Sequence, residues 1–140
     1  MDKVKRARLI AAIRAVEIPS RSHRVLVSRS QFFDGNDDPG SIGCNLTKHP
    51  GVGAFDKVFD QIEHTEGVSG VYLAISEVDE TYDDIWPFTD TALIATRLAP
   101  STFDAVLRRL SPDSIAPSQE SFANPPAVSE GYQLVSVWWD

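Results

Sequence analysis

FFDGNDDPGSIGCN, the stretch from Phe32 to Asn45, is the part of the sequence around which the rest of the chain is organised. Glycine supplies positive φ, proline fixes φ, and Asp and Asn side chains bond their own backbone, so regular helices and strands do not tolerate this density of them. We therefore expect an ordered loop in which Asp34, Asn36, Asp37 and Asp38 mainly accept bonds from backbone N–H groups. Gly35, Gly40 or Gly43 should have positive φ, with Phe32 and Phe33 anchoring the start of the loop.

The segments on either side of this loop have helical and strand periodicities. Residues 52–64 place Phe55, Val58, Phe59 and Ile62 on one face, which predicts a helix. Residues 68–78 alternate, which predicts a strand with one buried face. The other expected elements are a helix over 3–17 ended by Pro19, a strand over 23–28 leading into the loop, a strand over 91–98, a helix over 101–110 with Ser101 as N-cap, and a last strand over 132–140.

These elements predict a single α+β domain over residues 1–140. The strands over 68–78 and 91–98 are joined by an acidic connection short enough for an antiparallel pair. Residues 111–130 contain four prolines, so we expect an irregular surface segment there. The sheet should be mostly antiparallel, with about four or five strands and helices packed on one face. Residues 1–20 should form a basic N-terminal helix.

Charge is distributed unevenly along the 140 residues. Residues 1–30 carry eight Lys or Arg and two acids, whereas residues 31–140 carry five and eighteen, so the net charge of −7 divides into about +6 and about −13. An acidic body repels phosphate backbones and steers basic proteins toward it, which favours a basic protein partner over nucleic acid. The sequence also lacks a membrane-length apolar run and a signal peptide, and it has one cysteine, so we expect a cytoplasmic location. The oligomeric state stays open.

Two weak chemical signals lie in the central loop. Asp34, Asn36 and Asp38 have the spacing of the first three ligands of a calcium loop, but Pro39 stands where that loop needs glycine and Asn45 where it needs glutamate. Cys44 and His49 resemble a thiol with its base, yet Cys44 also fits a small buried residue entering the core. We predict no metal site, no cofactor and no catalytic residue.

A second notable stretch is Trp86-Pro-Phe-Thr-Asp90, which leads into an expected strand. In one interpretation its aromatic residues close an end of the core and Asp90 ties down N–H groups of the loop. In the other, this stretch and residues 34–38 form an acidic patch rimmed by aromatic side chains that binds a partner. The candidate binding residues are Asp34, Asn36, Asp37, Asp38, Trp86, Phe88 and Asp90.

These motifs, together with His-Pro-Gly at 49–51 and the ending Val-Trp-Trp-Asp, resemble a family of small uncharacterised bacterial proteins. In size and charge the chain is also similar in type to the immunity proteins that neutralise bacterial toxins. We accordingly expect a non-enzymatic protein-binding domain, with an immunity-type inhibitor of a basic toxin as its most specific form. The alternative is a small enzyme or ligand-binding domain whose pocket is formed by the loops 34–49 and 86–90 and includes Cys44 and His49.

Overall fold

Two long strands form the centre of the fold in the computed structural model, which describes residues 1–18 and 22–140. They are β2 (Val68–Glu77) and β3 (Phe88–Thr96), and they pair antiparallel, as predicted. Alternating residues of β2 enter two different clusters. Val71, Leu73 and Ile75 belong to the main core, whereas Ala74 lies in a smaller cluster on the opposite face. Apolar side chains are therefore buried on both faces of the sheet.

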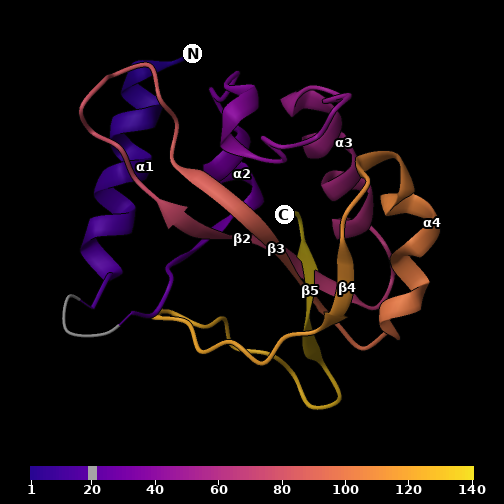
Figure 1. Cartoon of the computed structure of the whole chain (residues 1–140). Coiled ribbons are helices and arrows are strands. Elements are labelled where there is room, and N and C mark those ends of the chain that lie inside the picture. Colours follow the sequence, from indigo (N-terminus) through magenta and orange to yellow (C-terminus); the bar gives the residue numbers. More distant parts are fainter. Residues whose placement is uncertain (19–21) are drawn as a thin grey trace.

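Three shorter strands complete a five-stranded sheet in the order β1-β2-β3-β5-β4. β1 (Leu26–Ser28) and β4 (Ser114–Pro117) lie at the two edges, and β5 (Gln133–Trp138) lies between β3 and β4. Figure 1 shows the central strands crossing the molecule. Every pairing between neighbouring strands is antiparallel, which confirms the predicted α+β class and sheet type.

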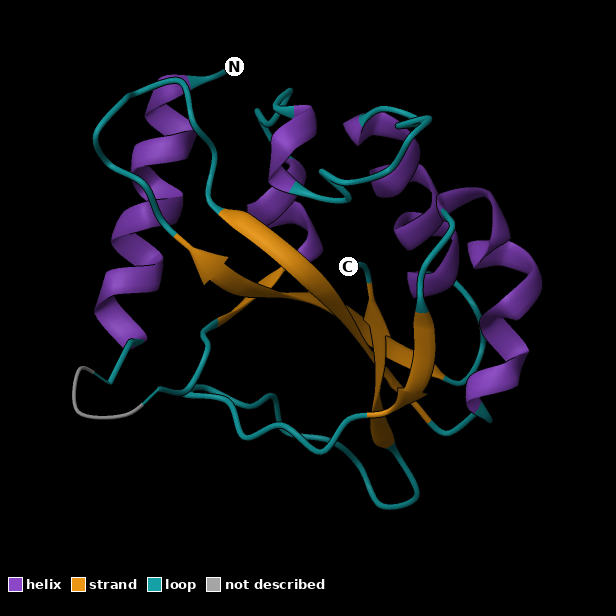
Figure 2. Ribbon diagram, viewed as in Figure 1, coloured by secondary structure: helices purple, strands orange, loops and turns teal. Residues whose placement is uncertain are grey.

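The helices lie along one face of this sheet, as Figure 2 shows. They are α1 (Lys3–Val16), α2 (Arg29–Phe33), α3 (Val52–Glu63) and α4 (Asp104–Leu107), with 3₁₀ turns at Pro39–Ser41, Pro100–Phe103 and Arg108–Leu110. Their apolar side chains meet the sheet in one continuous core with Trp86 and Trp139. Among the described residues no helix combines the length and apolar character needed to cross a bilayer.

The other face is covered by the long connection between β4 and β5, which runs below the sheet in Figure 2. Phe122 packs there with Leu26, Ala74 and Leu93 and is only 6% exposed. The side chain of Asn124 accepts a bond from Leu26 N and donates to Leu26 O, at 2.8 and 2.9 Å. This amide takes the place of a neighbouring strand and closes the free edge of β1.

Several element boundaries correct the sequence prediction. The expected strand over 23–28 is shorter in the structure and is limited to β1, although Val25 O still accepts a bond from Ile75 N of β2 at 2.9 Å. The chain then enters the loop through the helix α2, whose start is a capping box formed by Ser28 and Gln31, so Phe32 and Phe33 are helical. Pro19 lies outside the described residues.

The second half of the chain contains two further corrections. Ser101 is not an N-cap, since the Pro100–Phe103 turn begins after Ala99 without a side-chain cap. β4 lies inside the segment that was expected to be irregular. Ser118 N donates a bond to Leu134 O of β5. Because successive backbone nitrogens of a strand point to opposite sides, the nitrogen of Pro117 faces away from β5. A proline is tolerated at such an edge position because no ladder bond is lost.

Candidate functional site

The central loop is held to the strand region by Asp38. Its Oδ1 accepts a bond from Gly40 N at 2.9 Å, and its Oδ2 accepts one from Trp86 N at 3.0 Å. Asn36 accepts a bond from Asp38 N and donates to Ser41 Oγ. Gly35 and Gly43 have φ of 82° and 63°, whereas Gly40 does not have positive φ. For Asn36 and Asp38, the predicted bonding to backbone N–H groups is therefore present.

The other two acids of the loop contact the N-terminal segment and not backbone N–H groups, which corrects that prediction. Lys5 Nζ lies 2.7 Å from Asp34 Oδ1, and the N-terminal amine lies 2.7 Å from Asp37 Oδ2. The side chains of Asp34 and Asp37 are 62% and 70% exposed. Both acids are therefore accessible at the surface, where such ion pairs contribute about 0–1 kcal/mol.

The expected patch of acids and aromatic residues is assembled only in part. The bond from Trp86 N to Asp38 and a bridge between Ile42 and Thr89 place the loops side by side. However, the side chain of Trp86 is buried at 1% exposure, so it supplies no aromatic rim. Phe88 is half-buried, and Asp90 points to a different group of residues.

Cys44 and His49 do not form a thiol–base pair. Cys44 is exposed, which corrects the expectation that it enters the core. His49 Nδ1 accepts a bond from Gly51 N at 2.9 Å, so the ring proton is on Nε2, which donates to Ile42 O at 2.7 Å. The ring also packs on Phe55 at 5.4 Å between centroids. Both ring nitrogens therefore hold the backbone of the loop.

Arg6 fixes the loop between β2 and β3, a contact that the sequence analysis did not anticipate. Its residue exposure is 8%. The guanidinium donates to three backbone carbonyls, with Nε 2.7 Å from Ile85 O and Nη2 3.0 and 2.9 Å from Asp79 O and Tyr82 O. We call residues 79–84 the β2–β3 loop. The buried cation fixes the backbone of this loop while the side chain of Tyr82 remains 62% exposed.

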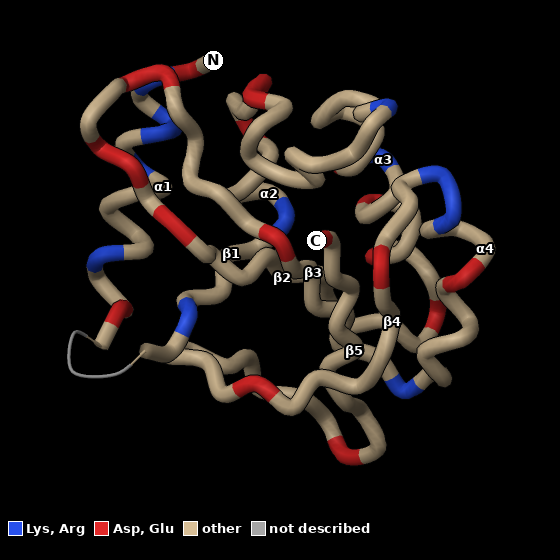
Figure 3. The backbone as a smooth tube through the Cα atoms, viewed as in Figure 1, with Lys and Arg blue, Asp and Glu red and all other residues tan. Residues whose placement is uncertain are grey.

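Two other cations of helix α1 lie against acids of the same loop, in the region of blue and red segments on the left of Figure 3. Lys3 Nζ lies 2.9 Å from Asp83, and Arg14 Nη2 lies 2.9 Å from Glu80. The ammonium of Lys3 lowers the pKa of Asp83, and the Thr81 backbone N–H lowers that of Asp79. The basic start of the chain thus pairs with its acidic body inside one molecule.

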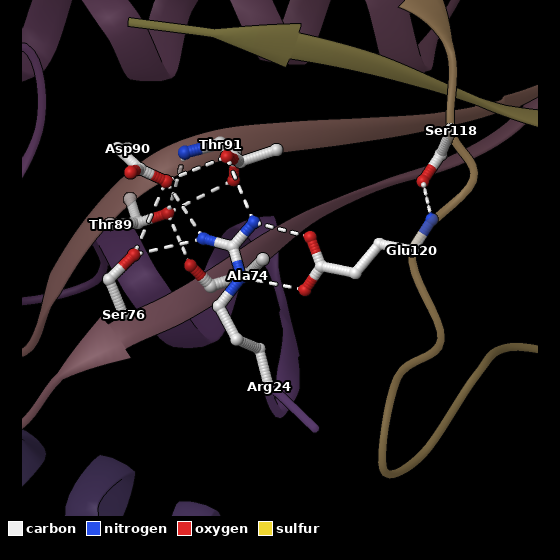
Figure 4. A network of polar contacts seen from close by, with 8 residues as sticks. All are labelled: Arg24, Ala74, Ser76, Thr89, Asp90, Thr91, Ser118 and Glu120. Carbon is white, nitrogen blue, oxygen red and sulfur yellow. Dashed lines mark hydrogen bonds and ion pairs between the residues drawn. The ribbon is translucent and has the colours of Figure 1, made fainter. Parts of the chain in front are cut away.

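A second polar cluster surrounds Arg24 on the helix-free face and is shown in Figure 4. Nε and Nη2 of Arg24 donate to the two carboxylate oxygens of Glu120, each at 2.7 Å. Nη1 donates to Asp90 Oδ1 at 2.8 Å and to Ser76 Oγ at 2.9 Å, and Nη2 donates to Thr91 Oγ1 at 3.1 Å. All five N–H groups of the guanidinium are used. Arg24 therefore joins β2, β3 and the β4–β5 connection.

Asp90 is held as an anion by this cluster. Burial alone would raise its pKa, but bonds from Thr91 and Arg24 and the charge of Arg24 outweigh the burial and hold the pKa below its ordinary value. Among the described residues, Arg24, Ser76 and Thr91 donate to Asp90, and all three bonds go to Oδ1. Among the candidate binding residues that the sequence indicated, Asp90 alone lines a groove on this face of the sheet.

This groove is open, has a volume of about 480 Å³ and lies between the sheet and the start of the β4–β5 connection, whose Ser118, Gln119 and Glu120 also line it. Strand residues form its floor and the Arg24 cluster forms one wall. Its lining includes Asp90, Thr91, Ser114, Ser136 and Trp138. Trp86 and His49 do not line it, so the groove is distinct from the pocket expected between the loops 34–49 and 86–90.

Sequence reasoning missed Arg6, Arg24, Glu120 and Trp138 as members of these clusters. For Arg6 a signal was present, because it lies on the same helical face as Leu9, Ile10 and Ile13, where an unpaired charge would be costly. For Arg24 and Glu120 there was no signal, since 96 residues separate them. Among the described residues, no group of three or more His, Cys, Asp or Glu side chains has the arrangement of a metal site.

Comparison with known proteins identifies the family. Residues 4–137 match the model of the family described as "Uncharacterized protein YfbO family", and the chain belongs to it. The chain is 29% identical over 120 residues to the protein described as "Uncharacterized protein YfbO" of Escherichia coli (strain K12), an alignment that covers 84% of each chain. No solved structure matches.

Proposed function

We propose that this member of the YfbO family is a non-enzymatic protein-binding domain that docks a basic protein through the β2–β3 loop. The observation that carries the proposal is Tyr82, which is 62% exposed at the surface while the backbone beneath it is fixed by the buried Arg6. Exposed tyrosines surrounded by polar residues are typical energetic centres of interfaces. A loop already fixed in one conformation loses little entropy on binding.

Charge supports a basic partner. The loop carries Asp79, Glu80, Asp83 and Asp84, and the whole chain has a net charge of −7. Lys3 and Arg14 pair with two of these acids, but their side chains are 59% and 44% exposed. Because exposed pairs contribute only about 0–1 kcal/mol, cations of a partner can replace them at little cost. The long-range field then speeds association in low salt.

Inhibition of a basic bacterial toxin is the specific form of this function that we propose. It agrees with the small acidic domain and with the lack of a thiol–base pair at Cys44 and His49. A toxin encoded beside the gene should then be tolerated by cells that co-express this chain. Growth arrest that is unchanged by co-expression would contradict the inhibitor form while leaving partner binding to be judged by purification.

Affinity purification from the native host tests partner binding. Wild-type protein should retain a basic protein at about 0.05 M salt and lose it near 0.5 M, because screening weakens exposed charge contacts. Tyr82→Ala should weaken retention about tenfold or more. Val128→Ala is the matched control, since Val128 is also exposed, at 42%, but lies in the β4–β5 connection. Equal retention by wild type and Tyr82→Ala would refute docking through the loop.

A further inference from the structure

The groove beside the Arg24 cluster brings three strands together at Trp138. In the sheet, Trp138 lies directly opposite Thr91 of β3 on one side and Ser114 of β4 on the other. Ser136 is two residues away on the same face, because its neighbours Val135 and Val137 both enter the main core. The indole and the two serine hydroxyls therefore share the floor of one concave surface. The side chain of Trp138 is large and apolar, yet the residue is 38% exposed.

In the groove, the unused hydrogen-bonding groups are mainly acceptors. Arg24 is the strongest donor on the wall, and all five of its N–H groups are already bonded. Asp90 Oδ2, Ser114 Oγ and Ser136 Oγ have no hydrogen-bond partner among the described residues. A carboxylate only accepts and a hydroxyl can also accept. The free groups are thus suited to a ligand rich in donors.

The charge of the wall points in the same direction. Arg24 contributes +1 and Asp90 and Glu120 contribute −1 each, so the cluster has a net charge of −1. A ligand with one positive charge would neutralise it. The face of a tryptophan ring attracts cations, and the aliphatic part of a cation can pack on the same ring. A volume of about 480 Å³ lies within the range of small-molecule sites.

We propose that this groove binds a monovalent organic cation, an ammonium or guanidinium group on a short aliphatic stem, with the stem on Trp138 and the charged head at Asp90. The head donates to Asp90 Oδ2 and to the hydroxyl of Ser114 or Ser136. Such a cation can come from a free small molecule or from a Lys or Arg side chain of a protein. The groove is on the helix-free face, because its residue Ser136 alternates with Val135 and Val137 of the main core. The β2–β3 loop is beside α1 (Figure 3), so this proposal stands independently of docking through Tyr82.

Titration of the ¹⁵N-labelled protein with n-butylguanidinium, followed by NMR, tests the proposal. Saturable shifts should appear at the indole N–H of Trp138 and the amide of Ser136, with a Kd of about 1–10 mM for so small a ligand. The neutral isostere n-butylurea, which has the same shape and no charge, should bind at least about tenfold more weakly. Equal affinity of the two ligands would overturn the proposal.

Three variants locate the binding. Trp138→Ala should weaken it about 2- to 30-fold, because the ring on which the stem packs and which attracts the cation is lost. Asp90→Asn should weaken it at least as much. Because Asp90→Asn also disturbs the Arg24 cluster, the third variant is Ser136→Phe, which fills the groove and leaves the ion pairs in place. It should abolish the shifts, whereas Val128→Ala should not alter them. Binding that survives Ser136→Phe would refute the assignment of the groove.

The two sources of the cation are distinguished by the shape of the probe. A blocked tripeptide with a central arginine carries the same guanidinium on a peptide backbone. Affinity equal to that of n-butylguanidinium would show that the open groove admits a protein side chain. Binding of n-butylguanidinium at least about tenfold stronger than that of the peptide would identify a small-molecule site. Shifts confined to the β2–β3 loop with both probes would overturn the proposal.

Discussion

Asp38 and Asp37 are adjacent acids in the central loop, and the structure predicts opposite consequences for removing them. Asp38→Ala leaves the N–H groups of Gly40 and Trp86 without their acceptor, and the second of these bonds is partly buried. Loss of the cap costs about 0.5–2 kcal/mol and an unsatisfied N–H about 1–3 kcal/mol. We expect Asp38→Ala to lower the free energy of unfolding by about 2–4 kcal/mol. For a domain of this size, the melting temperature should fall by roughly 8–16 °C.

Asp37→Ala should lower the free energy of unfolding by at most about 1 kcal/mol, because its 70% exposed side chain pairs only with the N-terminal amine among the described residues. Thermal and urea unfolding of both variants make the measurement. Asp84→Ala is the control, since Asp84 is exposed and has no hydrogen-bond partner among the described residues. Asp38→Asn, with one acceptor oxygen, should have an intermediate stability. Equal losses for Asp37→Ala and Asp38→Ala would refute this account of the loop.

Three further predictions concern the other clusters. Arg6→Met removes three buried N–H donors. Amide hydrogen exchange should therefore accelerate in residues 79–84, and the free energy of unfolding should fall by about 2 kcal/mol or more. Arg8 is exposed, so the control Arg8→Met should change neither quantity. The pKa of Asp90 is lowered in the folded state, so its charged form stabilises the fold. The difference in unfolding free energy between wild type and Asp90→Asn should therefore be full above pH 3.8 and should decline as the pH falls further. A difference that does not depend on pH would contradict this. Phe122→Ala should cost about 3 kcal/mol in urea unfolding, and a loss below about 1 kcal/mol would show that the β4–β5 connection does not cover the sheet.

Elements with a regular apolar period could be predicted from the sequence. Residues of α3 such as Phe55 and Phe59 repeat at helical spacing over the whole element, and all of these apolar positions are buried. By contrast, β4 has four residues and ends at Pro117, which favours a loop when the chain is considered locally. Its strand character comes from pairing with β5. Such tertiary pairing overrides local preference and leaves no local signal.

The candidate sites were harder to predict, because long-range contacts decide what each polar side chain does. Asp38 was correctly expected to bond backbone N–H groups, but one of those groups, that of Trp86, lies 48 residues away. The grouping of Asp90 with Trp86 followed from their closeness in sequence, whereas their side chains lie in different environments. Arg6 shows what a sequence can reveal, since a cation on the buried face of a helix requires partners.

The uneven charge of the chain has a different meaning in the fold than along the sequence. Cations of α1 lie against acids of the β2–β3 loop and of the central loop, so the basic start screens part of the acidic body. These pairs are exposed and each is worth at most about 1 kcal/mol, whereas Arg6 is buried and cannot leave without exposing three unpaired carbonyls. The basic partner that we propose would therefore displace Lys3 and Arg14 but not Arg6. It would meet a loop whose backbone is already fixed, so we expect the contact with Tyr82 to determine affinity and the charges to determine mainly the rate of association.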